Sequence, residues 1–337
     1  MGDIVLTTPV IRALRRTFPD ARIDYVTKRQ FTELLHGNPG LNTVHAYDSR
    51  AGFAGLRALG KQLREQRCDL LVDLHSNLRT RVLQLLIRPR RTVRYSKHLL
   101  RRTLLVKGGL NLYPRPIIQM PDRYLRPLKK LGVKNDDAGL ELFPSDAHRA
   151  TVAELFRQHH VSDDEWVVGL GPIASFPLKQ WPVERFAEVG QELVTRYRAR
   201  IILFGGPVDV GQVQSLAAHI PNHPIVLCGE FSMMESAAAL ERCALFVGND
   251  TGTAHIAAAM GCKVVSIFGP TVEELGFYPY HVPAHVVSVP LPCRPCTHTG
   301  KGRCRIKTHA CMRNIAPADV LAAITRESIP RLRAEGH

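Results

Sequence analysis

The stretch ALFVGNDTGTAHIAAAMGCKVVSIFGPT, residues 244–271, decides the fold. Its pattern predicts a short buried strand that ends at Gly248, an alanine-rich helix over 251–260, and a second apolar strand over 264–268 that ends in a Gly-Pro-Thr turn. A strand, a helix and a strand in this order form a βαβ unit of a parallel sheet. In such sheets ligands bind beyond the carboxyl ends of the strands, where both turns of this unit lie.

The turn after the first of these strands carries polar residues suited to an anionic ligand. Asn249 and Asp250 lie immediately before the helix. A helix N-terminus presents unpaired N–H groups and a partial positive charge, and both favour a phosphate. Because Asn and Asp are also common helix caps, a βαβ unit with ordinary caps remains the alternative.

Two more turns are expected at the same edge of the sheet. An apolar strand that ends at Leu170 leads into a loop that contains Ser175 and Lys179. Another strand, which ends at Phe204, leads through a Gly-Gly-Pro turn to Asp209. A lysine ammonium in this place can reach a phosphate, and a carboxylate can accept hydrogen bonds from ribose hydroxyls. A solvated lysine and a helix-capping aspartate are the alternatives.

The motifs together resemble glycosyltransferase family 9, the ADP-heptose:lipopolysaccharide heptosyltransferases of Gram-negative bacteria. The similar segments are GDIVLTTP at 2–9, DLHSNLRT at 73–80, DRYL at 122–125, KQWP at 179–182, and GNDTGTAHIAAAMG with FGPT within 248–271. The resemblance implies an α/β fold of two facing Rossmann-like domains, the GT-B architecture. It also implies a metal-independent, inverting transfer of a heptose from ADP-heptose to the inner core of lipopolysaccharide, with no catalytic cofactor.

The same resemblance implies roles for individual residues. Asp3 would be the general base that takes the proton of the acceptor hydroxyl, unless it only caps the first helix. Lys179, with Ser175, would neutralise the diphosphate. Asp209 would hold the ribose, and Asp250 would bind sugar hydroxyls. The other donor-binding residues would be Thr251, Gly252, His255, Gly269, Pro270 and Thr271. The histidine in this set is equally well explained as a packing residue.

The resemblance also divides the chain. We expect an acceptor-binding domain over 1–145, a nucleotide-sugar-binding domain over 146–316, and a C-terminal helix within 317–337 that can return to the N-terminal domain. A Rossmann-like domain opens with a strand that leads into its first turn, whereas this sequence begins at Met1, two residues before Asp3. We therefore expect the first strand of the N-terminal domain to be missing, which would leave the carboxylate on a frayed terminus.

The excess positive charge is confined to one half of the chain. Residues 1–150 hold 28 Lys and Arg against 13 Asp and Glu, whereas the remaining residues hold 17 of each kind. The run of basic residues from Arg79 to Arg102 contains no acidic residue. It suits phosphorylated lipid A and core sugars at an anionic membrane surface. The candidate acceptor-binding residues are His75, Asn77, Arg79, Arg90 and Arg91.

Other classes of protein share some of these features. A basic half also suits nucleic acid, but Tyr95 is the single aromatic residue in the run and no nucleic-acid motif is present, so no such partner is expected. The remaining alternatives are another nucleotide-sugar-dependent transferase of the same fold and a catalytically impaired protein that binds sugars or a lipid surface. The sequence contains neither a secretory signal nor an apolar stretch that could span a bilayer. We therefore expect a cytoplasmic protein, peripheral to the inner membrane.

Four of the eight cysteines gather towards the C-terminus, as Cys293-x2-Cys296-x7-Cys304-x6-Cys311. Disulfides are disfavoured in a reducing compartment, so four thiols at this spacing favour a structural zinc or a similar ion. A reduced surface loop without metal is the alternative, and the sequence leaves both open.

Overall fold

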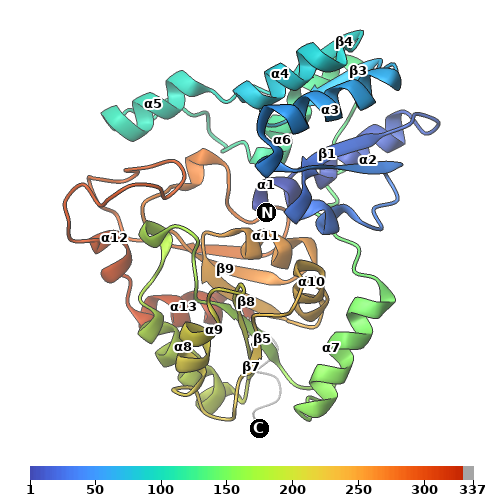
Figure 1. Ribbon diagram of the computed structural model, residues 1–337. Coiled ribbons are helices and arrows are strands. Elements are labelled where there is room, and N and C mark those ends of the chain that lie inside the picture. Colours follow the sequence, from blue (N-terminus) through green and yellow to red (C-terminus); the bar gives the residue numbers. More distant parts are fainter. Residues whose placement is uncertain (329–337) are drawn as a thin grey trace.

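The computed structural model describes residues 1–328 of the 337-residue chain. Two α/β domains face one another, with the N-terminus of the chain between them (Figure 1). The N-terminal domain lies above and the C-terminal domain below in this view. All paired strands are parallel, as predicted for a doubly wound fold. None of the helices within the described residues has both the length and the apolar character that crossing a bilayer requires.

The C-terminal domain is built on a six-stranded sheet with the order β10-β9-β8-β5-β6-β7. Its strands are β5 (Val167–Gly171), β6 (Arg200–Phe204), β7 (Ile225–Leu227), β8 (Leu245–Asn249), β9 (Lys263–Ile267) and β10 (Ala284–Val287). The βαβ unit predicted from the sequence is confirmed as β8, α11 (Gly252–Ala259) and β9. β8 lies inside the sheet between β9 and β5, so its end lies beside the ends of both neighbours.

Helices cover both faces of this sheet. Besides α11 they are α7 (Asp146–Gln158), α8 (Val183–Tyr197), α9 (Val210–Ala217), α10 (Met233–Glu241), α12 (Ala310–Arg313) and α13 (Pro317–Ser328). α8, α9 and α13 bury the face that carries Val168 and Leu170. α7, α10 and α11 bury the opposite face, which carries Val167. Successive side chains of β5 therefore enter different cores, as the alternation of a strand requires.

The N-terminal domain has no continuous central sheet. Its elements are α1 (Gly2–Val5), α2 (Thr8–Thr17), β1 (Asp24–Lys28), η1 (Arg29–Leu35), β2 (Thr43–Tyr47), η2 (Ser49–Ala51), α3 (Gly52–Glu65), β3 (Leu70–Asp73), α4 (Leu78–Ile87), β4 (Arg91–Arg94), α5 (Leu99–Gly108), α6 (Met120–Leu125) and η3 (Arg126–Leu131). β1 pairs with β2 and β3 with β4, in two separate sheets. Among the described residues no strand joins β1 to β3, in agreement with the expected gap.

The last helix belongs to the C-terminal domain. α13 packs against α8, β9 and β10, and Val320, Ala323 and Ile324 are buried in that contact. The expected return to the N-terminal domain is therefore corrected for the residues through Ser328. Residues 329–337 lie outside the described part of the chain.

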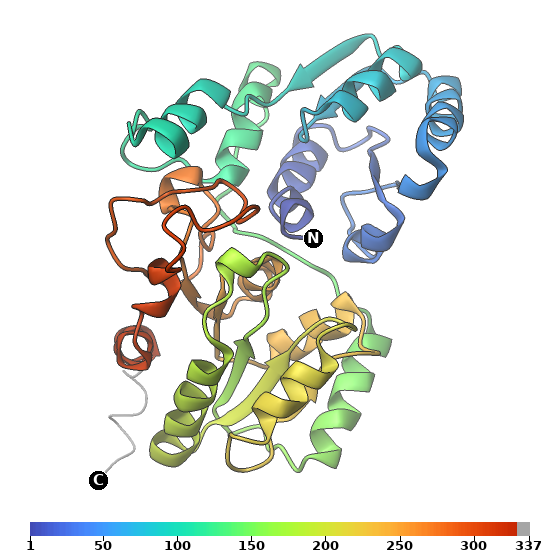
Figure 2. The ribbon, with the colours of Figure 1, turned by 60° about the vertical axis from the view of Figure 1, so that its left-hand side comes forward.

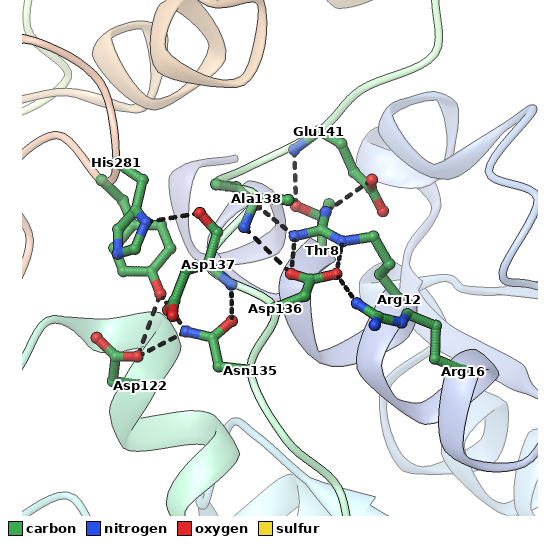
Figure 3. Close-up of polar contacts among 12 residues, drawn as sticks. Thr8, Arg12, Arg16, Asp122, Asn135, Asp136, Asp137, Ala138, Glu141 and His281 are labelled. Carbon is green, nitrogen blue, oxygen red and sulfur yellow. Dashed lines mark hydrogen bonds and ion pairs between the residues drawn. The ribbon is translucent and has the colours of Figure 1, made fainter.

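The chain passes from one domain to the other through a clamp of charged residues (Figure 3). Arg12 of α2 forms a two-point ion pair with Asp136, in which both N–O distances are 2.8 Å. The same guanidinium lies 2.7 Å from a carboxylate oxygen of Glu141, and Arg16 lies 2.7 Å from Asp136. The segment between the domains is thereby fixed to the second helix of the chain.

The other side of this segment is fixed to α6 and to the C-terminal domain. Asn135 donates hydrogen bonds to Asp122 of α6 at 2.9 Å and to the hydroxyl of Tyr280 at 2.7 Å. His281 lies 2.8 Å, through Nδ1, from the carbonyl oxygen of Asp137. The clamp therefore sets how the two domains stand relative to one another.

We expect Asp136→Asn to lower the free energy of unfolding by about 2 kcal/mol, because it removes one of the two carboxylates that pair with the largely buried Arg12. The guanidinium of Arg12 holds the pKa of Asp136 well below its usual range. The contribution is therefore complete above the unfolded-state pKa, about 4, and is lost as the pH falls below it.

Urea unfolding of the parent and the variant at pH 7 and pH 3 checks this prediction. The matched control is Asp137→Asn, because that exposed carboxylate forms no ion pair within residues 1–328. A stability difference for Asp136→Asn as large at pH 3 as at pH 7 would contradict the ion-pair explanation.

Candidate active site

Asn249, the last residue of β8, holds two of the predicted turns together. Its Oδ1 accepts a hydrogen bond from the backbone N–H of Trp181 at 2.9 Å, and its Nδ2 donates to the carbonyl of Pro172 at 2.9 Å. Trp181 is fully buried, and its indole N–H donates to the carbonyl of Ile315 at 3.0 Å. The loop after β5, which includes η4 (Pro177–Lys179), is thereby fixed beside the end of β8.

Lys179, Asp250 and Thr271 meet in a buried polar cluster. Nζ of Lys179 lies 2.5 Å from Oδ2 of Asp250, and the Thr271 hydroxyl donates to the same oxygen at 2.7 Å. The side chains of Lys179 and Asp250 are 14 % and 5 % exposed. They come from the turns after β5, β8 and β9, so the structure brings these three candidates together. Each charge is tolerated in this place because the other one is beside it.

The first helix of the chain rests on the N-terminus of α11. A Cβ atom at Gly252 would lie 2.9 Å from the backbone nitrogen of Gly2, and one at Gly2 would lie 2.9 Å from Cδ2 of His255. Both positions need glycine for this approach. Burial lowers the pKa of His255 to about 4, and its Nδ1 has no hydrogen-bond partner within the described residues. The imidazole is therefore neutral, with one polar atom unpaired.

The other donor candidates lie in the turns at the same edge of the sheet. Thr251 is the N-cap of α11 but its side chain makes no capping hydrogen bond. Ser175 is exposed in the loop after β5. Oδ2 of Asp209 accepts the backbone N–H of Gly206 at 2.8 Å, so it closes the turn after β6. The carbonyl of Pro270 accepts a backbone N–H at 3.1 Å, and Gly269 packs tightly on Met312.

Asp3 lies exposed on α1, among aromatic and basic side chains of the N-terminal domain. Burial, together with the charge of Asp3, raises the pKa of Tyr95 to about 12. Burial lowers the pKa of His75, and Asp3 acts in the opposite direction. Burial also lowers the pKa of Lys97, which Asp3 again opposes. Because α1 packs against the N-terminus of α11, Asp3 lies at the junction of the two domains.

Asp73, at the end of β3, fixes the loop that carries His75. Its Oδ1 accepts the N–H of Ser76 at 2.8 Å, and its Oδ2 accepts Nε of Arg94 at 2.9 Å. Burial raises the pKa of Asp73, but these hydrogen bonds outweigh burial and lower it below its ordinary value. Asn77 caps α4, because its side chain accepts the N–H of the third helical residue at 2.9 Å. The loop is thus rigid, and the Asn77 side chain is already used in holding it.

The three candidate arginines are not gathered around Asp3. Arg79 lies 5.4 Å from the ring centre of a tyrosine that ends β2. Arg90 pairs at the surface with Asp69, at 3.3 Å. Arg91 begins β4, whereas Asp73 is paired with the residue that ends it, about 10 Å further along the strand. Arg90 and Arg91 therefore lie at the end of the strands remote from the His75 loop.

The segment that carries the clustered cysteines covers the donor-site turns. In the cysteine-rich segment, residues 288–309, a Cβ atom at Gly300 would lie 2.7 Å from Cγ of Lys179. Arg294 donates to carbonyls of the turn after β9, two of them at 3.1 Å. Arg305 donates to a carbonyl of α5 at 2.9 Å. The segment thus connects the donor-site turns with the N-terminal domain.

The cysteines of this region are not gathered into a preformed metal site. All eight cysteines of the chain are free of disulfides. Burial raises the pKa of the Cys311 thiol to about 11, with smaller effects from the other three thiols of the predicted set. Within residues 1–328 no three His, Cys, Asp or Glu side chains are arranged to hold a metal ion. The zinc site expected from the spacing stays a prediction.

Comparison with known proteins agrees with this arrangement of domains and turns. The profile of glycosyltransferase family 9 (heptosyltransferase) matches residues 56–305. The lipopolysaccharide heptosyltransferase 3 of Escherichia coli is 28% identical over 279 residues, which are 80% of this chain and 81% of that protein. A crystal structure of a family 9 glycosyltransferase from Veillonella parvula has a TM-score of 0.73 and 28% identity, and the match covers 85% of this chain and 82% of that one.

A more distant solved structure has the same fold. It is the E. coli heptosyltransferase WaaC with ADP-2-deoxy-2-fluoro heptose, which has a TM-score of 0.67 and 18% identity, and the match covers 97% of this chain and 96% of that one. At this identity the likeness shows the fold alone. Two facing Rossmann-like domains, the GT-B architecture, are therefore common to this chain and to known heptosyltransferases.

Proposed function

Since this chain belongs to glycosyltransferase family 9, we propose that it transfers a heptose from ADP-heptose to the inner core of lipopolysaccharide, with inversion and without a catalytic metal. The observation that carries the proposal is the position of Asp3, whose helix touches the N-terminus of α11 beside the Lys179–Asp250 cluster. The similarity to a lipopolysaccharide heptosyltransferase supports the substrate class. The structure of WaaC with a fluorinated ADP-heptose supports the donor.

In the proposed reaction the acceptor hydroxyl gives its proton to the carboxylate of Asp3. The acceptor oxygen forms a bond to the anomeric carbon, and the bond from that carbon to the diphosphate oxygen breaks, which releases ADP. A single displacement of this kind inverts the anomeric configuration. The base must come within hydrogen-bond distance of the hydroxyl, and a carboxylate at the junction of the two domains can do so.

The donor would lie on the turns of the C-terminal domain. Lys179 and the first N–H groups of α11 would stabilise the diphosphate as its charge grows in the transition state. Asp250 and Thr271 would hold sugar hydroxyls. Asp209 already closes its own turn with one oxygen, and its other oxygen would hold the ribose.

The acceptor would lie on the N-terminal domain, against the loop that Asp73 fixes. The charge of Asp3 acts on the pKa of both His75 and Lys97. They would orient phosphorylated core sugars through hydrogen bonds and charge. The basic surface of this domain would bring the enzyme into peripheral contact with the anionic membrane that carries the acceptor.

We expect ADP-heptose to raise the melting temperature by about 5 °C at a concentration a hundred times its dissociation constant. Uridine diphosphate sugars should give no such shift. The matching activity test adds ADP-heptose and a heptose-deficient core acceptor and follows the gain of one heptose by mass spectrometry. Stabilisation by uridine but not adenine diphosphate sugars would overturn the heptose donor and leave another transferase of the same fold.

We also propose that the four clustered thiols bind a structural metal ion, which would draw them together from their present separation. The support is that Cys293, Cys296 and Cys304 lie in the cysteine-rich segment, and Cys311 follows directly in α12. Arg294 and Arg305 tie this segment to the donor-site turns and to α5. A four-thiolate set of this kind is typical of zinc.

Protein purified without chelator should then carry about one metal ion per chain, as measured by elemental analysis. Cys296→Ser should lower both the metal content and the melting temperature, because metal binding contributes to the free energy of folding. Cys68→Ser, a half-buried thiol of the N-terminal domain, is the control. If the purified protein contains no metal and Cys296→Ser leaves its melting temperature unchanged, the proposal fails. The segment is then a reduced surface loop.

A further inference from the structure

The exposed apolar side chains of this protein are concentrated in one part of the N-terminal domain. Nine large hydrophobic residues are exposed in the described part of the chain, and six of them lie between Leu78 and Leu112. Four belong to α4 and α5, where they are 59% to 78% exposed: Leu78, Leu85, Leu99 and Leu100, called here the four leucines. Exposed apolar groups that gather in this way mark an interaction surface.

On α4 the leucines alternate with arginines along one face. Leu78, Arg81, Leu85 and Arg88 are all exposed. The first three are separated by three and four positions, a spacing that places them on the same side of the helix. Arg88 follows as the residue that ends α4, in the left-handed conformation. The opposite side of α4 packs against α3 and buries Ile87. One face of α4 is therefore packed in the core, and the other presents both leucines and arginines to solvent.

α5 repeats this arrangement. Leu99, Thr103 and Lys107 are exposed at intervals of four, with Leu100 beside them, whereas Leu105 is buried on the other side. Figures 1 and 2 both show α4 and α5 on the part of the N-terminal domain that is remote from the C-terminal sheet. Arg305 of the cysteine-rich segment contacts the last turn of α5 at Val106, whereas the four leucines remain exposed.

The charge around the four leucines has one sign. From residue 74 to residue 121 the sequence contains eleven Lys and Arg and no Asp or Glu. A nucleic acid would satisfy the arginines but leave the leucines in water. An anionic bilayer satisfies both, because leucines can enter the boundary between headgroups and acyl chains while arginines contact the lipid phosphates.

We propose that α4 and α5 form a docking surface for an anionic lipid bilayer, into which the four leucines insert. The inference rests on the proposed function because that function requires a lipid-anchored acceptor in the same bilayer. α4 begins at Leu78, directly after the loop that carries His75. Docking would therefore bring the acceptor end of the active site to the membrane surface.

Flotation of the full chain with vesicles tests this surface. The parent should bind vesicles of phosphatidylglycerol with phosphatidylethanolamine and bind those of phosphatidylcholine much less. Leu85→Gln combined with Leu99→Gln should weaken binding to the anionic vesicles about tenfold or more, because each inserted leucine loses its transfer to an apolar medium. Arg81→Gln combined with Arg88→Gln should weaken it by a similar factor at low salt.

Salt separates the two contributions. In high salt the effect of the arginine pair should fade, whereas the effect of the leucine pair should persist. Val208→Gln is the matched control, since Val208 is 94% exposed but lies in the C-terminal domain. Its binding should equal that of the parent, and melting temperatures confirm that all variants fold.

Binding that the leucine pair leaves unchanged would overturn the insertion, and so would a parent protein that ignores anionic vesicles. Transfer to a core oligosaccharide freed of its lipid separates this inference from the proposed function. The leucine variants should keep that activity. If the parent binds vesicles but transfers nothing to the soluble acceptor, the proposed function fails while the docking surface stands.

Discussion

Turnover should fall about a hundredfold or more in Asp3→Asn, because general-base assistance contributes a factor of about 10² to 10⁴ to the rate. Asparagine keeps the size of the side chain and can still cap a helix, but it cannot take the proton of the acceptor hydroxyl. The donor should bind as in the parent, since its proposed contacts lie on the turns after β5, β8 and β9. The loss should therefore appear in kcat rather than in the dissociation constant of the donor.

Steady-state kinetics at saturating donor, together with calorimetry of donor binding, would measure both quantities. Asp20→Asn is the matched control, because Asp20 is an exposed carboxylate of the same domain. Its turnover should equal that of the parent. If Asp3→Asn also keeps the parent's turnover, Asp3 is only a residue of the first helix and another group must be the base.

The second large effect is expected for Lys179→Met. Removal of its ammonium from the diphosphate should lower kcat/KM for the donor about 10² to 10³-fold, the loss seen when one group that stabilises transition-state charge is deleted. The variant should also be less stable by about 3 kcal/mol, because it leaves the carboxylate of Asp250 buried without a charged partner.

A second substitution separates these two consequences. Lys179→Met combined with Asp250→Asn removes the unpaired charge, so stability should largely return while activity stays low. Lys301→Met is the control, since it removes a positive charge from the segment over the same turns without breaking the buried pair. Donor affinity that survives in Lys179→Met would contradict contact between Lys179 and the diphosphate.

The donor side of the site could be predicted because its chemistry is encoded locally. Each candidate follows an apolar strand and precedes a helix, and parallel strands place such turns at one edge of the sheet. Lys179, Asp250 and Thr271, taken from three separate segments, do meet there.

The acceptor side could be predicted only in part, because its residues are gathered by tertiary contacts. The charge of Asp3 acts on the pKa of His75. By contrast, the Asn77 side chain caps α4, and Arg91 lies at the far end of its strand. Lys97 was only one member of a long basic run in the sequence. β4 ends just before Tyr95, the one aromatic residue of that run. A strand that ends at this point was the signal that could have distinguished Lys97 from the other basic residues.

Elements at the margins of the fold were also hard to predict. β2 and β10 are edge strands that carry polar residues such as His45 and His285, so neither shows a continuous apolar run. For α13 the apolar stripe of Val320, Ala323 and Ile324 indicates that the helix packs on something. Its pattern does not say which domain supplies the surface.

Because Lys179 is already paired with Asp250, a ligand can bind the Lys179 ammonium only by replacing the Asp250 carboxylate. A small anion such as inorganic phosphate gains little there, because it must displace a carboxylate from the ammonium and offers that carboxylate nothing in return. A sugar joined to a diphosphate can compensate both partners, since its phosphate takes the ammonium while its hydroxyls donate to the freed oxygens. Discrimination against the simple anions of the surrounding solution thus follows from a contact within the protein itself.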